Sequence, residues 1–183
     1  MLTSESIDAN HPDLPLIRNL YEQAFPAIER IPFAEEFEET PNYTNQVIAF
    51  YDDHEFAGFI TTSAREDIVL IDYFAVAPTM RGRGIGSAVL TQLQQQFSGK
   101  RIVLEIEVLD RNAANYSQRL HRRNFYMRNG FTMTNISYKA YGCPFSVMIS
   151  GGQISAAEYH RFYDPTLPVS EMQPYVAPRL QTA

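Results

Sequence analysis

Three glycines in five positions, just before a helix-forming stretch, are the chemically most informative feature of this sequence. They belong to the run Arg81-Gly-Arg-Gly-Ile-Gly-Ser87. A turn without Cβ atoms can curl with its N–H groups pointing inward, and the positive end of the helix dipole adds to these donors. Arg81 and Arg83 can supply charge-assisted hydrogen bonds. The run therefore predicts an anion site; the alternative is a tight connection with two solvated arginines.

The spacing of the glycines separates the anions that this turn can bind. A P-loop continues with Lys-Ser/Thr, and no lysine follows Gly86, which disfavours nucleoside triphosphates. The dinucleotide fingerprint G-x-G-x-x-G fits Gly82 and Gly84, but Ser87 occupies its third glycine position. Glu105 lies about where a ribose-binding acid would be expected, although the unit sits in mid-chain behind a hairpin. An NAD-type dinucleotide-binding domain is therefore an alternative.

Carboxylates on the strands that flank this turn are candidates for a general base. Asp72 lies before the turn, and Glu105 and Glu107 lie after the helix. Strand alternation puts Asp72 on the face of Phe74 and Val76. A carboxylate in mid-strand costs desolvation free energy unless it is paired or hydrated. We rank Asp72 and Glu105 ahead of Glu107; the alternatives are a salt bridge to nearby arginines for each, or a water chain as the base.

Metal and cysteine chemistry have little support in the sequence. Cys143 is the one cysteine, which excludes an intramolecular disulfide and a Cys-based zinc cage. It precedes Pro144 and has no obvious base partner, so packing is the favoured role. The four histidines lack metal-ligand spacing. We therefore expect no metal.

The elements that position these residues are predicted to form an α+β fold. The length of 183 residues fits one domain, which we expect at residues 1–163, followed by a Pro-rich extended tail at residues 164–183. Periodicity and turn signals predict a mixed, mostly antiparallel central sheet with helices on both faces. The predicted helices are one that ends before Pro26, then 85–97, 115–128 and 155–163; the predicted strands are 46–51, 55–62, 68–77, 101–109, 131–138 and 145–150.

Composition is typical of a globular protein and disfavours several partners. Hydrophobic residues make up 45% and charged residues 20% of the chain. The formal charge of −6 argues against a general nucleic-acid binder. No apolar stretch approaches the roughly 18 residues of a membrane span, and the first residues lack a basic, signal-like start. We therefore expect no nucleic acid, no membrane and a cytoplasmic location.

The pattern Arg81-x-x-Gly84-x-Gly86 resembles the acyl-coenzyme A pyrophosphate loop of the GNAT acyltransferases. In that superfamily the loop follows a strand that ends in a motif like Tyr73-Phe-Ala-Val-Ala-Pro78. Further along, Val103-Leu-Glu-Ile-Glu-Val108 looks like the fifth strand of the family. Phe125-Tyr-Met-Arg-Asn-Gly-Phe131 resembles the signature at the end of its helix. The resemblance spans residues 46–150, with its motifs in the family's order.

This resemblance implies a GNAT-like fold and an N-acetyltransferase that uses acetyl-CoA as co-substrate. A primary amine would attack the thioester directly, and Tyr126 would protonate the departing thiolate. The residues implied to bind acetyl-CoA are Phe74, Ala75, Val76, Arg81, Gly82, Arg83, Gly84, Ile85, Gly86 and Ser87. Two departures limit what can be transferred: Asp110 stands where many members have Asn, and the segment before Tyr126 is longer than in compact members.

The acceptor is predicted from charge. The acidic run Glu35–Glu39, together with Asp72 and Glu105, would attract cations, which favours a cationic amine, either a small molecule or a peptide. Three aromatic residues could line its pocket, with core packing as the alternative: Tyr138, Tyr141 and Phe145. We expect a monomer or homodimer. A non-catalytic acyl-CoA-binding regulatory module, which would need neither Tyr126 nor a base, is a further alternative.

Overall fold

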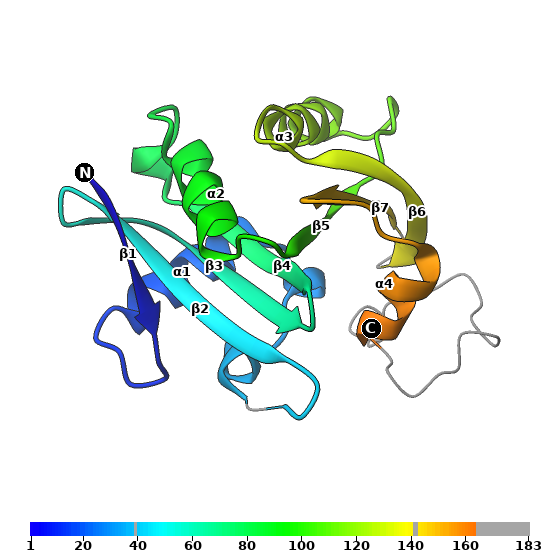
Figure 1. The fold of residues 1–183 in the computed structure, drawn as a ribbon. Helices are drawn as coiled ribbons and strands as arrows, with labels where there is room; N and C mark the ends of the chain where they lie inside the picture. The colour runs from blue at the N-terminus through cyan, green and yellow to red at the C-terminus, as the bar shows by residue number, and fades with distance from the viewer. Residues whose placement is uncertain (39, 141–142, 164–183) are drawn as a thin grey trace. The chain divides into compact units, whose positions relative to one another are not determined.

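The computed structural model describes residues 1–38, 40–140 and 143–163 (Figure 1). The chain divides into two compact units, residues 1–98 and residues from 99 onward. Each unit combines antiparallel strands with helices, as expected for the predicted α+β class. The predicted Pro-rich tail and Tyr141 lie outside the described residues.

The first unit is built on four strands that pair in chain order, each antiparallel to the next. A hairpin joins β2 to β3 at Asp53 and His54, whose φ angles are 48° and 69°. Positive φ at both central residues is typical of the turns that match the twist of paired strands, so the predicted hairpin is confirmed. The elements are β1 (Leu2–Ile7), α1 (Leu14–Ala24), β2 (Thr44–Asp52), β3 (Glu55–Arg65), β4 (Ile68–Val76) and α2 (Ile85–Gln96), with short 3₁₀ helices at Ala27–Glu29, Phe33–Phe37 and Pro78–Met80.

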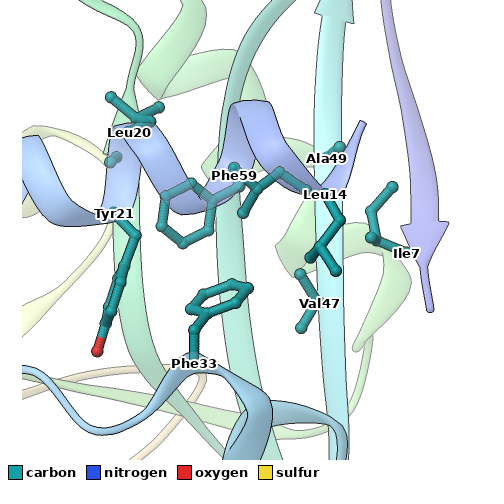
Figure 2. Packing of buried hydrophobic residues seen from close by; sticks show 10 residues of the cluster. Ile7, Leu14, Leu20, Tyr21, Phe33, Val47, Ala49 and Phe59 are labelled. Carbon is teal, nitrogen blue, oxygen red and sulfur yellow. The ribbon is translucent and has the colours of Figure 1, made fainter. Parts of the chain in front are cut away.

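A core rich in aromatic residues packs α1 against one face of these strands. In Figure 1, α1 lies behind the strands and α2 in front of them. Figure 2 shows Tyr21, Phe33 and Phe59 packed together, and Tyr21 and Phe33 have ring centroids 4.9 Å apart. The Tyr21 hydroxyl also donates a hydrogen bond of 3.0 Å to the carbonyl of Ile31. These contacts tie the segment after α1 to the sheet that carries the glycine turn.

The strand β1 is a feature that sequence patterns did not predict. Its residues Thr3, Ser4, Glu5 and Ser6 are polar and exposed, so no apolar alternation marks them as a strand. They form one because their backbone pairs antiparallel with β2, from Leu2 opposite Asp52 to Ile7 opposite Val47. The other predicted strands and helices are present, with ends within three residues of the predicted ranges.

The second unit contains three strands in the order β5, β7, β6, each antiparallel to its neighbour. None of the helices among the described residues has both the length and the apolar character that crossing a membrane requires. The elements of this unit are β5 (Arg101–Glu107), α3 (Tyr116–Arg128), β6 (Thr132–Ala140), β7 (Cys143–Ser150) and α4 (Ala156–Tyr163).

A capping box fixes the start of α4. The Ser155 N–H donates to the Glu158 carboxylate at 2.9 Å, and the Glu158 N–H donates back to the Ser155 hydroxyl at 3.2 Å. Arg101 of β5 adds a hydrogen bond of 2.8 Å to the same carboxylate. Together the two Ser155 donors and Arg101 lower the pKa of Glu158 to about 2. The ionised Glu158 therefore ties α4 to its own cap and to β5.

We expect Glu158→Gln to destabilise the protein at pH 7 by about 1 kcal/mol, a size set by capping and a half-exposed ion pair. The pKa of Glu158 in the folded protein lies below the ordinary 4.5. The ionised carboxylate therefore stabilises the folded state fully above pH 4.5, and this stabilisation is lost as the pH falls toward 2. Urea unfolding at pH 7 and pH 3 measures this, with the exposed α1 variant Glu22→Gln as control. If the free energies of unfolding of wild type and Glu158→Gln differed equally at both pH values, the stabilising role of the ionised Glu158 would be contradicted.

Candidate functional site

A short 3₁₀ helix, Pro78–Met80, joins the end of β4 to the glycine turn. The N–H of Ala77 donates to the carbonyl of Ala57 at 2.9 Å, which continues the pairing with β3 past the last residue of β4. The Arg81 side chain then folds back, and its Nε donates to the Val76 carbonyl at 3.0 Å. The turn is thereby held against the strand that precedes it.

The turn depends on glycine for its backbone conformation rather than for space. Gly82 and Gly84 have φ angles of 76° and 79°, a region that residues with side chains rarely adopt. A Cβ at either position would meet nothing within 4 Å. The space beside both glycines is therefore open, and a ligand can approach the backbone there.

The N-terminus of α2 offers unsatisfied backbone donors at this point. Gly84 is its N-cap residue, no side chain in the described part of the chain caps it, and its first turn contains no acidic residue. The first N–H groups of a helix have no intrahelical partner. Such an end binds anionic groups through its N–H donors and its dipole. The geometry thus fits the phosphates that the sequence predicted for this turn.

The two arginines of the turn differ in what they offer an anion. Arg83 donates to the Met80 sulfur at 2.9 Å, and its guanidinium lies 3.7 Å from the Asp52 carboxylate, which offsets part of its charge. Arg81 is exposed and uses its Nε for Val76, while its terminal nitrogens contact no partner among the residues that the structure describes. Arg81 is therefore the better placed anion ligand.

Asp72 lies in a β-bulge, which corrects the predicted alternation. Thr61 pairs with Tyr73 and Thr62 with Ile71, so Asp72 is an extra residue in β4. The Ser63 hydroxyl donates to its carboxylate at 2.7 Å. The bulge shifts the phase of the strand, so the face shared by Phe74 and Val76 does not extend to Asp72. Sequence alternation could not reveal this, because the extra residue is visible only in the register with β3.

Glu105 is held by phenols in the second unit. Its carboxylate accepts hydrogen bonds from Tyr138, Tyr159 and Tyr163, the last at 2.6 Å. The sequence singled out Glu105 as a base and Tyr138 as an aromatic lining residue, but it missed the two tyrosines of α4. Their spacing of four residues indicates that both lie on one face of a helix. It does not indicate which carboxylate lies against that face.

Glu107 is part of an ion-pair network that ties β5 to α3. It accepts a hydrogen bond from Asn115 at 3.0 Å, lies 3.5 Å from Arg119 and pairs with Arg122. Its side chain is only 11% exposed. The salt-bridge alternative is therefore the one found for Glu107, which supports its lower rank among the candidate bases.

Tyr126 lies near the C-terminus of α3, where the predicted helix-end signature forms a cap. Its carbonyl accepts the N–H groups of Asn129 at 3.0 Å and Phe131 at 3.1 Å. Its side chain is 9% exposed and packs against Phe125 and Phe131. Burial raises the pKa of Tyr126 to about 12, although Arg122 opposes part of this shift. The phenol is therefore protonated at neutral pH and able to donate.

The predicted site residues divide between the two units. The first unit brings together the end of β4 and the glycine turn, with Asp72 farther back along the same strand. The second unit carries Glu105 on β5 and Tyr126 on α3. The residues of the first unit form the candidate anion site, and those of the second are the candidate proton-transfer groups.

Known structures resemble this one at low sequence identity. A protein classed as a GNAT-family acetyltransferase from Bacteroides thetaiotaomicron is 23% identical, with 86% of this chain and 91% of that chain covered and a TM-score of 0.71. The ribosomal-protein-S18-alanine N-acetyltransferase from Escherichia coli is 22% identical, with 85% and 96% covered and a TM-score of 0.60. An aminoglycoside 6'-N-acetyltransferase complexed with coenzyme A is 20% identical, with 81% and 96% covered and a TM-score of 0.63.

The sequence itself matches one family over most of its length. Residues 14–131 match the Acetyltransferase (GNAT) family. No protein of curated function matches the sequence significantly. The family match decides against the dinucleotide-binding and non-catalytic alternatives, and it confirms the predicted GNAT fold. The chain therefore belongs to the GNAT family of acetyltransferases, enzymes that take their acetyl group from acetyl-CoA.

Proposed function

We propose that this enzyme is an N-acetyltransferase that acetylates a cationic primary amine, either a small molecule or a peptide, by direct attack on the thioester of acetyl-CoA. The observation that carries the proposal is the N-terminus of α2, which no side chain of the described residues caps and which follows two glycines at positive φ. A site of this kind suits a pyrophosphate. When bound there, acetyl-CoA supplies an activated acyl group.

The chain's own residues would hold the co-substrate from two sides of the turn. The backbone of Phe74, Ala75 and Val76 would pair with the pantetheine arm. The N–H groups of residues 82–87, with Arg81, would bind the pyrophosphate through charge-assisted hydrogen bonds. A strand end and a helix start joined by a short turn are rigid supports, and rigid positioning of both reactants lowers the activation barrier.

The distribution of charge supports a cationic acceptor. Residues 1–98 contain 15 of the 21 acidic residues but only five of the 15 basic ones, so their formal charge is −10, whereas residues 99–183 carry +4. Within the acidic run, Glu35 and Glu38 are exposed, whereas Glu36 is 5% exposed. An excess of this size attracts cations and raises their local concentration.

Tyr126 is proposed as the donor to the leaving thiolate, with Glu105 or Asp72 as the base. A phenol with a pKa of about 12 lies several pH units above a thiol near 8.5. Complete proton transfer from Tyr126 is therefore uphill, and its contribution is a hydrogen bond that stabilises developing negative charge. An ammonium has no lone pair, so the base must take one proton before the amine attacks, and a second N–H proton must leave the nitrogen as the thiolate departs. Each candidate carboxylate lies mid-strand with a hydroxyl partner.

Gly84→Asp should weaken acetyl-CoA binding far more than Gly84→Asn. Both side chains tolerate positive φ better than most, and they differ mainly in charge. Like charge beside the phosphates should cost about 2 kcal/mol, or about 30-fold in Kd. Calorimetric titration of both variants with acetyl-CoA measures the difference. Equal dissociation constants would place the pyrophosphate elsewhere.

Tyr126→Phe should reduce kcat by about 10²-fold and leave the Kd of acetyl-CoA nearly unchanged, because only a transition-state hydrogen bond is lost. Tyr116→Phe, which removes a hydroxyl from the same helix, is the control and should keep full activity. Thiol release with an amine panel gives kcat, and calorimetry gives Kd. Full turnover by Tyr126→Phe would reduce Tyr126 to a packing residue.

The KM of the amine should rise several-fold when the salt concentration is raised from 0.1 M to 1 M at saturating acetyl-CoA. Over this range the Debye length falls from about 10 Å to about 3 Å, which screens the acidic field. A diamine and a carboxylate-bearing amine are compared in the thiol-release assay. Preference for the anionic amine, with a KM insensitive to salt, would show that charge does not select the acceptor.

A further inference from the structure

Three phenols converge on one carboxylate in the second unit, and we call Glu105, Tyr138, Tyr159 and Tyr163 the Glu105 cluster. Tyr138 comes from β6, whereas Tyr159 and Tyr163 come from α4 and lie on one face of that helix. All three hydroxyls donate to Glu105 of β5. The hydroxyls of Tyr159 and Tyr163 are also 3.5 Å apart. A single side chain of β5 is thus the meeting point of β6 and α4.

The rings of the cluster are fixed by packing. Tyr159 is 1% exposed, and its ring meets the edge of Tyr163 with centroids 5.3 Å apart. Tyr138 stacks on Phe145 at 5.8 Å with an interplanar angle of 12°. Burial, followed by the charge of Glu105, raises the pKa of both α4 phenols well above the ordinary value. Both α4 phenols are therefore protonated and able to donate at neutral pH, and the packing limits how far their rings can move.

An ionised carboxylate has about four lone-pair positions that can accept a hydrogen bond. Three of those on Glu105 are occupied by the phenols. The three hydrogen bonds restrict the orientation of the carboxylate, and the described residues leave about one acceptor position for another donor.

We propose that Tyr159 and Tyr163 are positioning residues that orient Glu105 to accept the proton of the acceptor amine, so that α4 completes the catalytic base. The inference rests on the proposed function, in which Glu105 is a candidate base. It extends that function to a helix beyond the matched family region, which ends at residue 131. A proton-accepting group held within a narrow range of positions makes the transfer faster than a mobile one.

The test compares single hydroxyl deletions with a matched control. Tyr159→Phe and Tyr163→Phe each remove one donor and keep the ring. Tyr51→Phe is the control, since the Tyr51 hydroxyl donates to the Asp13 carboxylate at 2.7 Å in the first unit. We expect each α4 variant to lower kcat about tenfold with an unchanged KM for acetyl-CoA. Tyr51→Phe should leave kcat unchanged, whatever its effect on the melting temperature.

A double-mutant cycle on kcat separates positioning from stability. In a Glu105→Gln background, Tyr163→Phe should cause no further loss, because the group that it positions is already gone. Additive losses, or unchanged kcat in both α4 variants, would overturn the inference. Unchanged kcat in Glu105→Gln would also overturn it, while leaving Asp72 as the base of an intact acetyltransferase. Wild-type turnover with the amine panel tests the proposed function separately.

Discussion

The N–H groups at the start of α2, which no side chain in the described part of the chain caps, are the constraint on which the candidate site depends. Backbone donors without a partner cost free energy in a dry interior, so such an end must face water or a ligand. The start of α2 directly follows a turn in which two glycines adopt φ angles that L-residues rarely take. The helix in turn is anchored by four buried side chains: Ile85, Val89, Leu90 and Leu93. The site is therefore a set of donors held open by a well-packed helix.

Three carboxylates of the two units have different kinds of hydrogen-bond partner. Glu107 joins β5 to α3 through arginines, and Glu105 meets phenols. Asp72 accepts from a serine at a bulge. An arginine offsets the charge of a carboxylate with its own, whereas a neutral hydroxyl orients and stabilises the carboxylate but leaves its net negative charge. The hydroxyl-bonded carboxylates are for this reason the better candidates for a base, and the arginine-bonded one is a structural tie.

Acidic and basic residues are distributed unequally between the two units of the chain. The glycine turn carries Arg81 and Arg83 within a unit whose formal charge is −10. Positive charge is concentrated where phosphates would bind, and Arg83 shares its charge with Asp52. The remaining acidic excess is the basis on which we propose a cationic acceptor.

The sequence by itself determined the features that depend on neighbouring residues. Glycine spacing located the turn and apolar periodicity located the helices, because backbone preferences and helix faces are set over a few residues. The role of Tyr126 stays a prediction that rests on the resemblance of its motif to the family. The tertiary structure decided the rest. The strand β1 exists through its pairing with β2, and the bulge at Asp72 through its register with β3. The partners of Glu105 lie 33, 54 and 58 residues away, and hydrogen bonds between such distant positions follow from how the elements pack, which no local pattern encodes.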